Sequence, residues 1–312
     1  MKRRFYTLRD GDLSALHFGD TSEPVRLVFL HANGFNAQSY RAVMEDLGVH
    51  SVVFDMRGHG HSRGMPQPKG LANWHIFRDD CMEFFERHLP SLTDNPVVLA
   101  GHSFGAVSAA LSAPFLTGKL SGYVGFDPVS VPFLFRLTSN LPGGRSYMKK
   151  RVPIARNAGR RKSVFESPDA AFTRWQGRGA FRGMSDDILR DYIDGGLIER
   201  TDGQWELACD PKWEQAIFVA QWHNIFKAVR SLPDNSKFIY AGGRPPVSTA
   251  SARRAIQKAQ PKIDVQYLPS LLCQQRVFVL LGKSIIVEKP RCRGNSSFSY
   301  HSLFFHFKAF TF

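Results

Sequence analysis

The chain has 312 residues, of which 43% are hydrophobic and 22% charged, and its formal net charge at pH 7 is +14. This composition excludes a disordered or fibrous protein, and no apolar run approaches the ~18 residues of a membrane-spanning helix. The four cysteines form no Cys-x-x-Cys pair, which argues against a structural zinc site and a redox dithiol and predicts a reducing, cytoplasmic location.

Short apolar runs alternate with helix-period segments through the first 130 residues. The predicted strands are Leu13–Phe18, Val25–Leu30, Ser51–Phe54, Val97–Ala100 and Gly122–Phe126, and the predicted helices are Ala37–Leu47, Asn73–His88 and Phe104–Leu116. This alternation is typical of an α/β fold with a mostly parallel sheet covered by helices on both faces. In such sheets ligands bind at the carboxyl ends of the strands, so the loops that follow the strands are the candidate site.

The alternation of predicted strands and helices stops between Val129 and Leu232, where Pro, Gly and Arg are frequent. Two helical patterns, Ser185–Gly195 and Trp213–Arg230, lie inside this segment. The alternation resumes with a strand, a helix and a final strand, which are predicted at Lys237–Ala241, Thr249–Ala259 and Ile263–Leu268. We therefore predict a core in two parts, 1–128 and 233–268, an insertion at 129–232, and an atypical tail at 269–312.

The positive charge is concentrated in the insertion. Twelve Lys and Arg residues lie from Arg136 to Arg182, against only Glu166 and Asp169. Net charge alone would suggest a nucleic acid or an anionic membrane surface as a partner. Because the segment contains no nucleic-acid-binding motif, we expect no nucleic-acid partner and interpret it as a solvated basic face.

A Gly-x-Ser-x-Gly pentapeptide, Gly101 to Gly105, stands between the strand that ends near Ala100 and the next helix. The pentapeptide alone is a weak signal, but a strand before it and a small-residue helix after it make the signal strong. A serine at such an elbow has a strained backbone, which flanking glycines permit, and presents its hydroxyl at the carboxyl edge of the sheet. The motif predicts Ser103 as a nucleophile and the backbone N–H of Phe104 as a donor to an oxyanion.

Two further loops follow strands. The run from His31 to Phe35 is a compact loop that can supply the second oxyanion donor, and by position we assign this role to the backbone N–H of Asn33. The run from Asp55 to Ser62 is dense in Gly and polar residues, and we interpret its side chains as braces of neighbouring loops.

These three ordered motifs resemble the α/β-hydrolase superfamily in its serine-hydrolase branch, over residues from about 13 to 268. The resemblance implies an α/β-hydrolase fold with a helical lid inserted after the sixth strand, and no metal or organic cofactor. It implies a nucleophile, acid, histidine order along the chain. Serine at position 103 argues against the relatives that use a carboxylate nucleophile.

The acid departs from the usual family position, because the segment after the strand Lys237–Ala241 has no carboxylate. Asp234 precedes that strand and belongs at the wrong end of the sheet. The other family position follows the sixth strand, where the resemblance implies Asp127 as the acid. The alternative is that Asp127 is a turn residue at the entry to the lid.

The catalytic histidine departs further from the family pattern. The family places it in the loop after the last strand, but here that loop, from Leu268 to Gln275, contains no histidine. A serine without a base is a weak nucleophile. We expect that the chain leaves its ancestral reading frame near Pro269, which would impair catalysis; the rival account is a divergent tail that returns His301 or His306 to the site.

Two functions follow. The first is a serine hydrolase that cleaves an ester or related acyl bond of a small-molecule substrate, for which the basic insertion favours an anionic group. The second is a non-catalytic ligand-binding protein that keeps the hydrolase fold.

Overall fold

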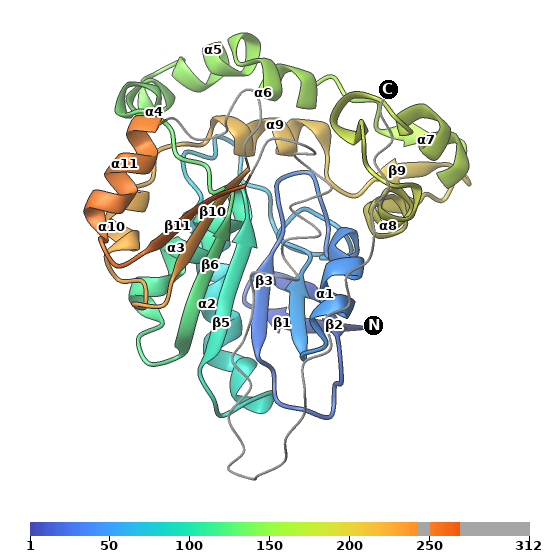
Figure 1. Cartoon of the computed structure of the whole chain (residues 1–312). Helices are drawn as coiled ribbons and strands as arrows, with labels where there is room; N and C mark the ends of the chain where they lie inside the picture. The colour runs from blue at the N-terminus through green and yellow to red at the C-terminus, as the bar shows by residue number, and fades with distance from the viewer. Residues whose placement is uncertain (242–249, 269–312) are drawn as a thin grey trace, which may run out of the picture.

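A computed structural model describes residues 1–241 and 250–268 of the chain. Its centre is a twisted sheet with the strand order β1-β2-β4-β3-β5-β6-β10-β11 (Figure 1). β1 pairs antiparallel with β2 and β2 antiparallel with β4, and the other neighbours are parallel. The strands are β1 (Lys2–Leu8), β2 (Gly11–Phe18), β3 (Leu27–Leu30), β4 (Ser51–Phe54), β5 (Val97–His102), β6 (Leu120–Phe126), β10 (Lys237–Ala241) and β11 (Asp264–Leu268).

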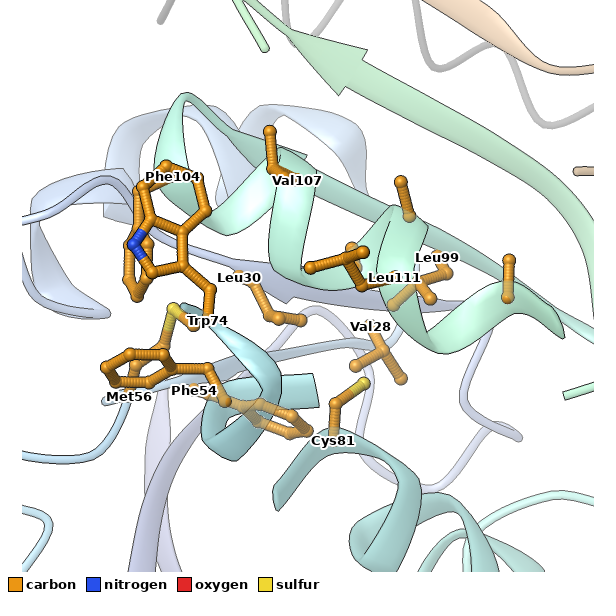
Figure 2. Packing of buried hydrophobic residues seen from close by; sticks show 14 of the residues in the cluster. Val28, Leu30, Phe54, Met56, Trp74, Cys81, Leu99, Phe104, Val107 and Leu111 are labelled. Carbon is orange, nitrogen blue, oxygen red and sulfur yellow. The ribbon is translucent and has the colours of Figure 1, made fainter. Parts of the chain in front are cut away.

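Helices cover both faces of this sheet. Its parallel strands are therefore apolar throughout, since the side chains of successive residues are buried on opposite faces, as in β3. Val28 and Leu30 pack with one face, and Leu27 and Phe29 pack with the other. Figure 2 shows part of the first face, where helices α2 and α3 pack on the sheet. The core helices are η1 (Gln38–Tyr40), α1 (Arg41–Leu47), α2 (His75–Arg87), η2 (Leu89–Ser91), α3 (Phe104–Ser112), η3 (Ala113–Phe115), α10 (Ile225–Val229) and α11 (Ala250–Ala259).

Most of the segment between β6 and β10, from α4 to α9, forms a cap beyond the carboxyl ends of the parallel strands (Figure 1). Its helices are α4 (Phe133–Asn140), α5 (Gly144–Arg151), α6 (Pro153–Ala158), α7 (Pro168–Trp175), η4 (Gly179–Phe181), α8 (Asp186–Gly196) and α9 (Pro211–Val219). The cap is mostly helical, as the resemblance implied, and it also contains a small sheet that the sequence did not predict: β7 (Val164–Phe165), β9 (Trp205–Leu207) and β8 (Leu197–Glu199) pair antiparallel. Strands of two or three residues are too short to show a period of two in the sequence.

Other predicted elements also differ from the structure. β1 was not predicted, because only alternate residues near its end are buried and four of its seven residues are basic or polar. The predicted helix Trp213–Arg230 is two helices, α9 and α10, since the backbone leaves the helical conformation at Ala220 and a new helix starts at the Asn224 cap. Of the predicted helix Thr249–Ala259, Thr249 lies outside the described residues, as does the tail 269–312.

Within residues 1–241 and 250–268, no helix combines the length and apolar character needed to cross a bilayer.

Candidate active site

Ser103 occupies a sharp turn between β5 and α3. Its backbone has φ 54° and ψ −114°, a region that residues other than glycine rarely adopt and that costs about 1–3 kcal/mol. The Ser103 N–H donates to the Phe126 carbonyl at 2.7 Å, which ties the turn to β6. The strand, turn and helix that the sequence predicted around the serine are therefore present.

The two glycines of the motif are required by close backbone approach. A Cβ at Gly101 would lie 2.6 Å from the backbone of Gly105, and a Cβ at Gly105 would lie 2.3 Å from the carbonyl oxygens of Leu30 and His31. Real Cβ atoms do not come this close to backbone atoms. The elbow consequently sits directly against the end of β3, where the predicted oxyanion loop begins.

Phe104, the first residue of α3, is anchored by its ring. The ring is buried and meets Trp74 edge-on at 5.1 Å between centroids (Figure 2). It also meets Phe77 edge-on, at 4.7 Å between centroids. The first amides of a helix have no intrahelical acceptor and carry the positive end of the helix dipole. The packing thus fixes a donor-bearing helix end beside Ser103.

Two neutral histidines hold the loop that follows β3. His31 Nε2 accepts from the Met56 N–H at 2.9 Å, and His59 Nε2 accepts from the Gly34 N–H at 3.1 Å. Burial lowers the pKa of His31 to about 4 and that of His59 to about 3, so both rings are uncharged at neutral pH. Each ring can therefore accept one hydrogen bond from the backbone and keep the loop in one conformation.

The side chain of Asn33 fastens this loop to the cap. Its Nδ2 donates to the backbone carbonyl of Glu214 on α9 at 3.0 Å, and the residue is buried. This contact uses the amide of the side chain and leaves the predicted oxyanion role to the backbone N–H of Asn33.

An ion pair that the sequence did not indicate lies behind the same loop. Arg161 donates to the Glu214 carboxylate at 2.7 Å and to the Tyr192 hydroxyl at 2.6 Å. Burial raises the pKa of the Glu214 carboxyl, and the guanidinium of Arg161 opposes that rise. A Cβ at Gly34 would lie 2.6 Å from Glu214 Oε1, so the pair also packs against the loop. No motif signals this pair, because its partners are 53 residues apart in the chain.

Replacing Arg161 with Met is expected to lower the free energy of unfolding by about 3 kcal/mol, because Glu214 would keep a buried and uncompensated charge. Urea denaturation of the full chain at pH 7 measures this loss. The double variant Arg161→Met with Glu214→Gln removes the charge and should recover most of the stability. If both variants lose the same free energy of unfolding, the uncompensated charge of Glu214 is not the cause of the loss.

The residues of the Asp55 to Ser62 run brace the core. The buried Asp55 carboxylate accepts from the Ala37 N–H and the Ser14 hydroxyl, both at 2.8 Å. Arg57 forms a two-point ion pair with Asp80, through Nε and one terminal nitrogen. These contacts join the loop after β4 to β2, to the segment that follows the oxyanion loop, and to α2.

Asp127 follows β6 at the same edge of the sheet as Ser103. β5 and β6 pair in register with His102 opposite Phe126, so the next residue of each strand is Ser103 and Asp127. Asp127 is buried, has φ 47°, and its N–H donates to the Ile239 carbonyl at 2.7 Å. Asp234 lies before β10 at the opposite edge, where it pairs with Lys262 on the surface.

The described histidines near the elbow have other partners. His102 Nδ1 forms a hydrogen bond of 2.9 Å with the Tyr40 hydroxyl, and that hydroxyl also accepts from the Ala32 N–H. His223 lies between α9 and α10, and its ring stacks on Trp74 at 4.4 Å. In the part of the chain that the structure describes, no histidine forms a hydrogen bond to Ser103. His301 and His306 lie outside the described residues.

No group of three or more His, Cys, Asp or Glu side chains within residues 1–241 and 250–268 is arranged to hold a metal ion.

The fold and the elbow together define an α/β hydrolase, and comparison of the sequence with family models agrees. Residues 27–271 match the model described as "Alpha/beta hydrolase family". The chain belongs to this family.

Among curated proteins, the chain is 36% identical over 90 residues to a lysophosphatidylserine lipase, ABHD12, of Gallus gallus. It is 30% identical over 113 residues to the monoglyceride lipase of Homo sapiens. The first match covers 27% of this chain and 22% of the relative, and the second covers 35% and 37%. The matched region therefore spans well under half of either relative.

Solved structures match over a larger share of the chain. The thioesterase domain from the curacin biosynthetic pathway has a TM-score of 0.68 at 15% identity, covering 91% of this chain and 98% of that domain. E-2-(acetamidomethylene)succinate hydrolase has a TM-score of 0.68 at 19% identity, covering 91% and 97%. At these identities the likeness establishes the fold alone.

Proposed function

We propose that this chain is a serine hydrolase that cleaves an ester or a related acyl bond through an acyl-enzyme on Ser103. The observation that carries the proposal is the strained turn at Ser103, which stands immediately before the first amides of α3. A serine without a chemical role would not need this conformation, because a relaxed turn would avoid the strain.

In the proposed reaction the Ser103 oxygen attacks the acyl carbon while a base takes the hydroxyl proton. The negative charge that develops on the acyl oxygen is stabilised by the backbone N–H groups of Phe104 and Asn33, each worth about 3–4 kcal/mol in such sites. The leaving alcohol then takes the proton from the base. Water attacks the acylated serine by the same steps and releases the acid, and Asp127 orients the base throughout.

No described histidine forms a hydrogen bond to Ser103, and the candidates for the base are His301 and His306 of the tail. If neither reaches the site, oxyanion stabilisation and substrate binding alone would give roughly 10³–10⁴-fold acceleration over water. This case is the second candidate function, a ligand-binding protein with a hydrolase fold, and the sequence feature that favours it is the lack of a histidine from Leu268 to Gln275.

The proposed substrate is a small molecule with an acyl bond. The names of two matched relatives specify lipid esters, lysophosphatidylserine and monoglyceride. The basic cap supports an anionic group on the substrate of this chain. A cytoplasmic location stays a prediction, with Cys81 and Cys209 as buried free thiols.

Exposure to a fluorophosphonate probe tests the proposal, because this reagent requires an activated serine. We expect the full chain to gain the mass of one probe group and the Ser103→Ala variant to gain none. Heat-denatured protein is the control for unspecific reaction. Folded protein that gains no mass would contradict the hydrolase and leave the ligand-binding protein, whereas equal labelling of the variant would place the reactive residue elsewhere.

A further inference from the structure

Exposed apolar side chains gather on one part of the cap. Helices α4, α5 and α6 lie in a row at the end of the molecule beyond the carboxyl ends of the parallel strands (Figure 1). Among the eleven large apolar residues exposed in the described part of the chain, five belong to this row and its connections: Phe133 (65% exposed), Leu134 (72%), Leu141 (52%), Tyr147 (59%) and Ile154 (56%). We call this row, residues 133–160, the cap rim.

The same segment is strongly cationic. Residues 128–165 contain nine Lys and Arg residues and no Asp or Glu. In the described residues, Arg161 alone among these nine forms an ion pair. The other positive charges are therefore not neutralised within the described protein.

The cationic side chains also line two neighbouring grooves. One groove of about 510 Å³ is lined by Lys149, Lys150, Arg156, Arg160 and Lys212, with Ser146, Gly159 and Gln215. The other, of about 430 Å³, shares Ser146 and Lys149 and adds Arg145 and Leu141. No carboxylate lines either groove, so both suit the phosphate of a lipid headgroup.

We propose that the cap rim is the surface by which this protein binds an anionic phospholipid bilayer. An element that lies in the membrane interface presents Phe and Leu to the acyl boundary and Lys and Arg to the headgroups, which is the combination found here. Anionic lipids attract Lys and Arg clusters near the surface, and salt weakens this attraction.

A nucleic acid fits this surface less well than a bilayer does. Phosphate contacts account for the cations, but the exposed Phe133 and Leu134 side chains on α4 would remain in water. A bilayer accounts for both kinds of side chain. Because the rim lies beyond the carboxyl ends of the strands, bilayer binding would turn the Ser103 edge of the sheet toward the lipid (Figure 1). The surface itself does not depend on Ser103 being reactive.

Co-flotation of the full chain with vesicles tests the proposal. We expect binding to phosphatidylcholine vesicles that contain phosphatidylserine, at least about tenfold weaker binding to phosphatidylcholine alone, and loss of binding as salt is raised. The variants Phe133→Ser with Leu134→Ser, and Lys149→Glu with Lys150→Glu, should each bind at least about tenfold more weakly than the unmodified chain.

Matched variants away from the rim serve as controls. Ile198→Ser removes an exposed apolar side chain from β8, and Arg254→Glu with Lys258→Glu reverses two exposed charges on α11. Both should bind like the unmodified chain, and thermal unfolding checks that every variant is folded.

Rim variants that are folded and bind vesicles as well as the unmodified chain would overturn the proposal. It would also be overturned if the chain bound RNA or DNA but no vesicle, or if the rim variants abolished a dimer and the chain bound no vesicle. Fluorophosphonate labelling of the same preparations reports on Ser103 separately, so failure of vesicle binding and failure of the hydrolase proposal are distinguishable.

Discussion

Replacing Asp127 with Asn is expected to slow the reaction of Ser103 with a fluorophosphonate by up to about 10⁴-fold, if Asp127 orients the base. A neutral amide cannot stabilise the charged base, and it favours the wrong tautomer of a histidine. The change is nearly isosteric, and Asn tolerates the positive φ of 47° that this position requires. The N–H bond to the Ile239 carbonyl uses the backbone and is kept. Time courses of labelling, followed by mass, measure the effect.

Asp234→Asn is the matched control for this prediction. Asp234 is the other aspartate beside β10, but it lies at the opposite edge of the sheet in a surface pair with Lys262. Its replacement should leave the labelling rate unchanged. A normal rate for Asp127→Asn would instead make Asp127 a turn residue at the entry to the cap, which is the alternative that the sequence left open.

Acidification from pH 7 to pH 5 is expected to remove at least about 5 kcal/mol from the free energy of unfolding. Burial is the largest cause that lowers the pKa of five histidines far below the usual 6.5: His17 to about 3, His31 to about 4, His59 to about 3, His102 to about 4 and His223 to about 3. The folded state keeps these rings neutral, while the unfolded chain takes up protons below pH 6.5. Stability is therefore full above pH 6.5 and is lost as the pH falls toward 4.

Each such histidine contributes about 2 kcal/mol to the loss at pH 5. Buried carboxyls act in the opposite sense, since burial raises the pKa of Asp80 to about 6 and the folded state then takes up that proton first. Five histidines outweigh this effect. Domains of ordinary stability have 5–15 kcal/mol in total, so we expect the chain to be near its unfolding midpoint at pH 5.

Urea denaturation at pH 7, 6 and 5 measures this loss. His223→Phe keeps a ring on Trp74 but removes one titrating group, so it should reduce the loss between pH 7 and 5 by about 2 kcal/mol. His223 is suited to this test because its Nδ1 is buried without a hydrogen-bond partner in the described structure. An unchanged pH dependence in the variant would mean that His223 is solvated and titrates normally in the folded protein.

The sequence predicted the core well where local pattern and burial agree. β3 and β4 are short, fully buried strands, and their apolar runs predicted both of them. β1 was missed because it is a sheet edge with polar side chains, and the helix Trp213–Arg230 was overextended because a break at Ala220 involves neither Gly nor Pro. Edge position and backbone breaks depend on neighbours that a sequence window does not contain.

The sequence by itself determined the elbow. The strained turn at Ser103 admits only glycine at 101 and 105, and the sequence shows both glycines. Only the tertiary structure decided how the loop after β3 is held. Asn33 joins it to Glu214, and Glu214 pairs with Arg161, across 181 and 53 residues of chain. It also decided that five apolar side chains of the cap face solvent among cations that form no ion pair with the described residues. Contacts and exposure of this kind follow from which elements pack together in space, and no spacing along the chain records them.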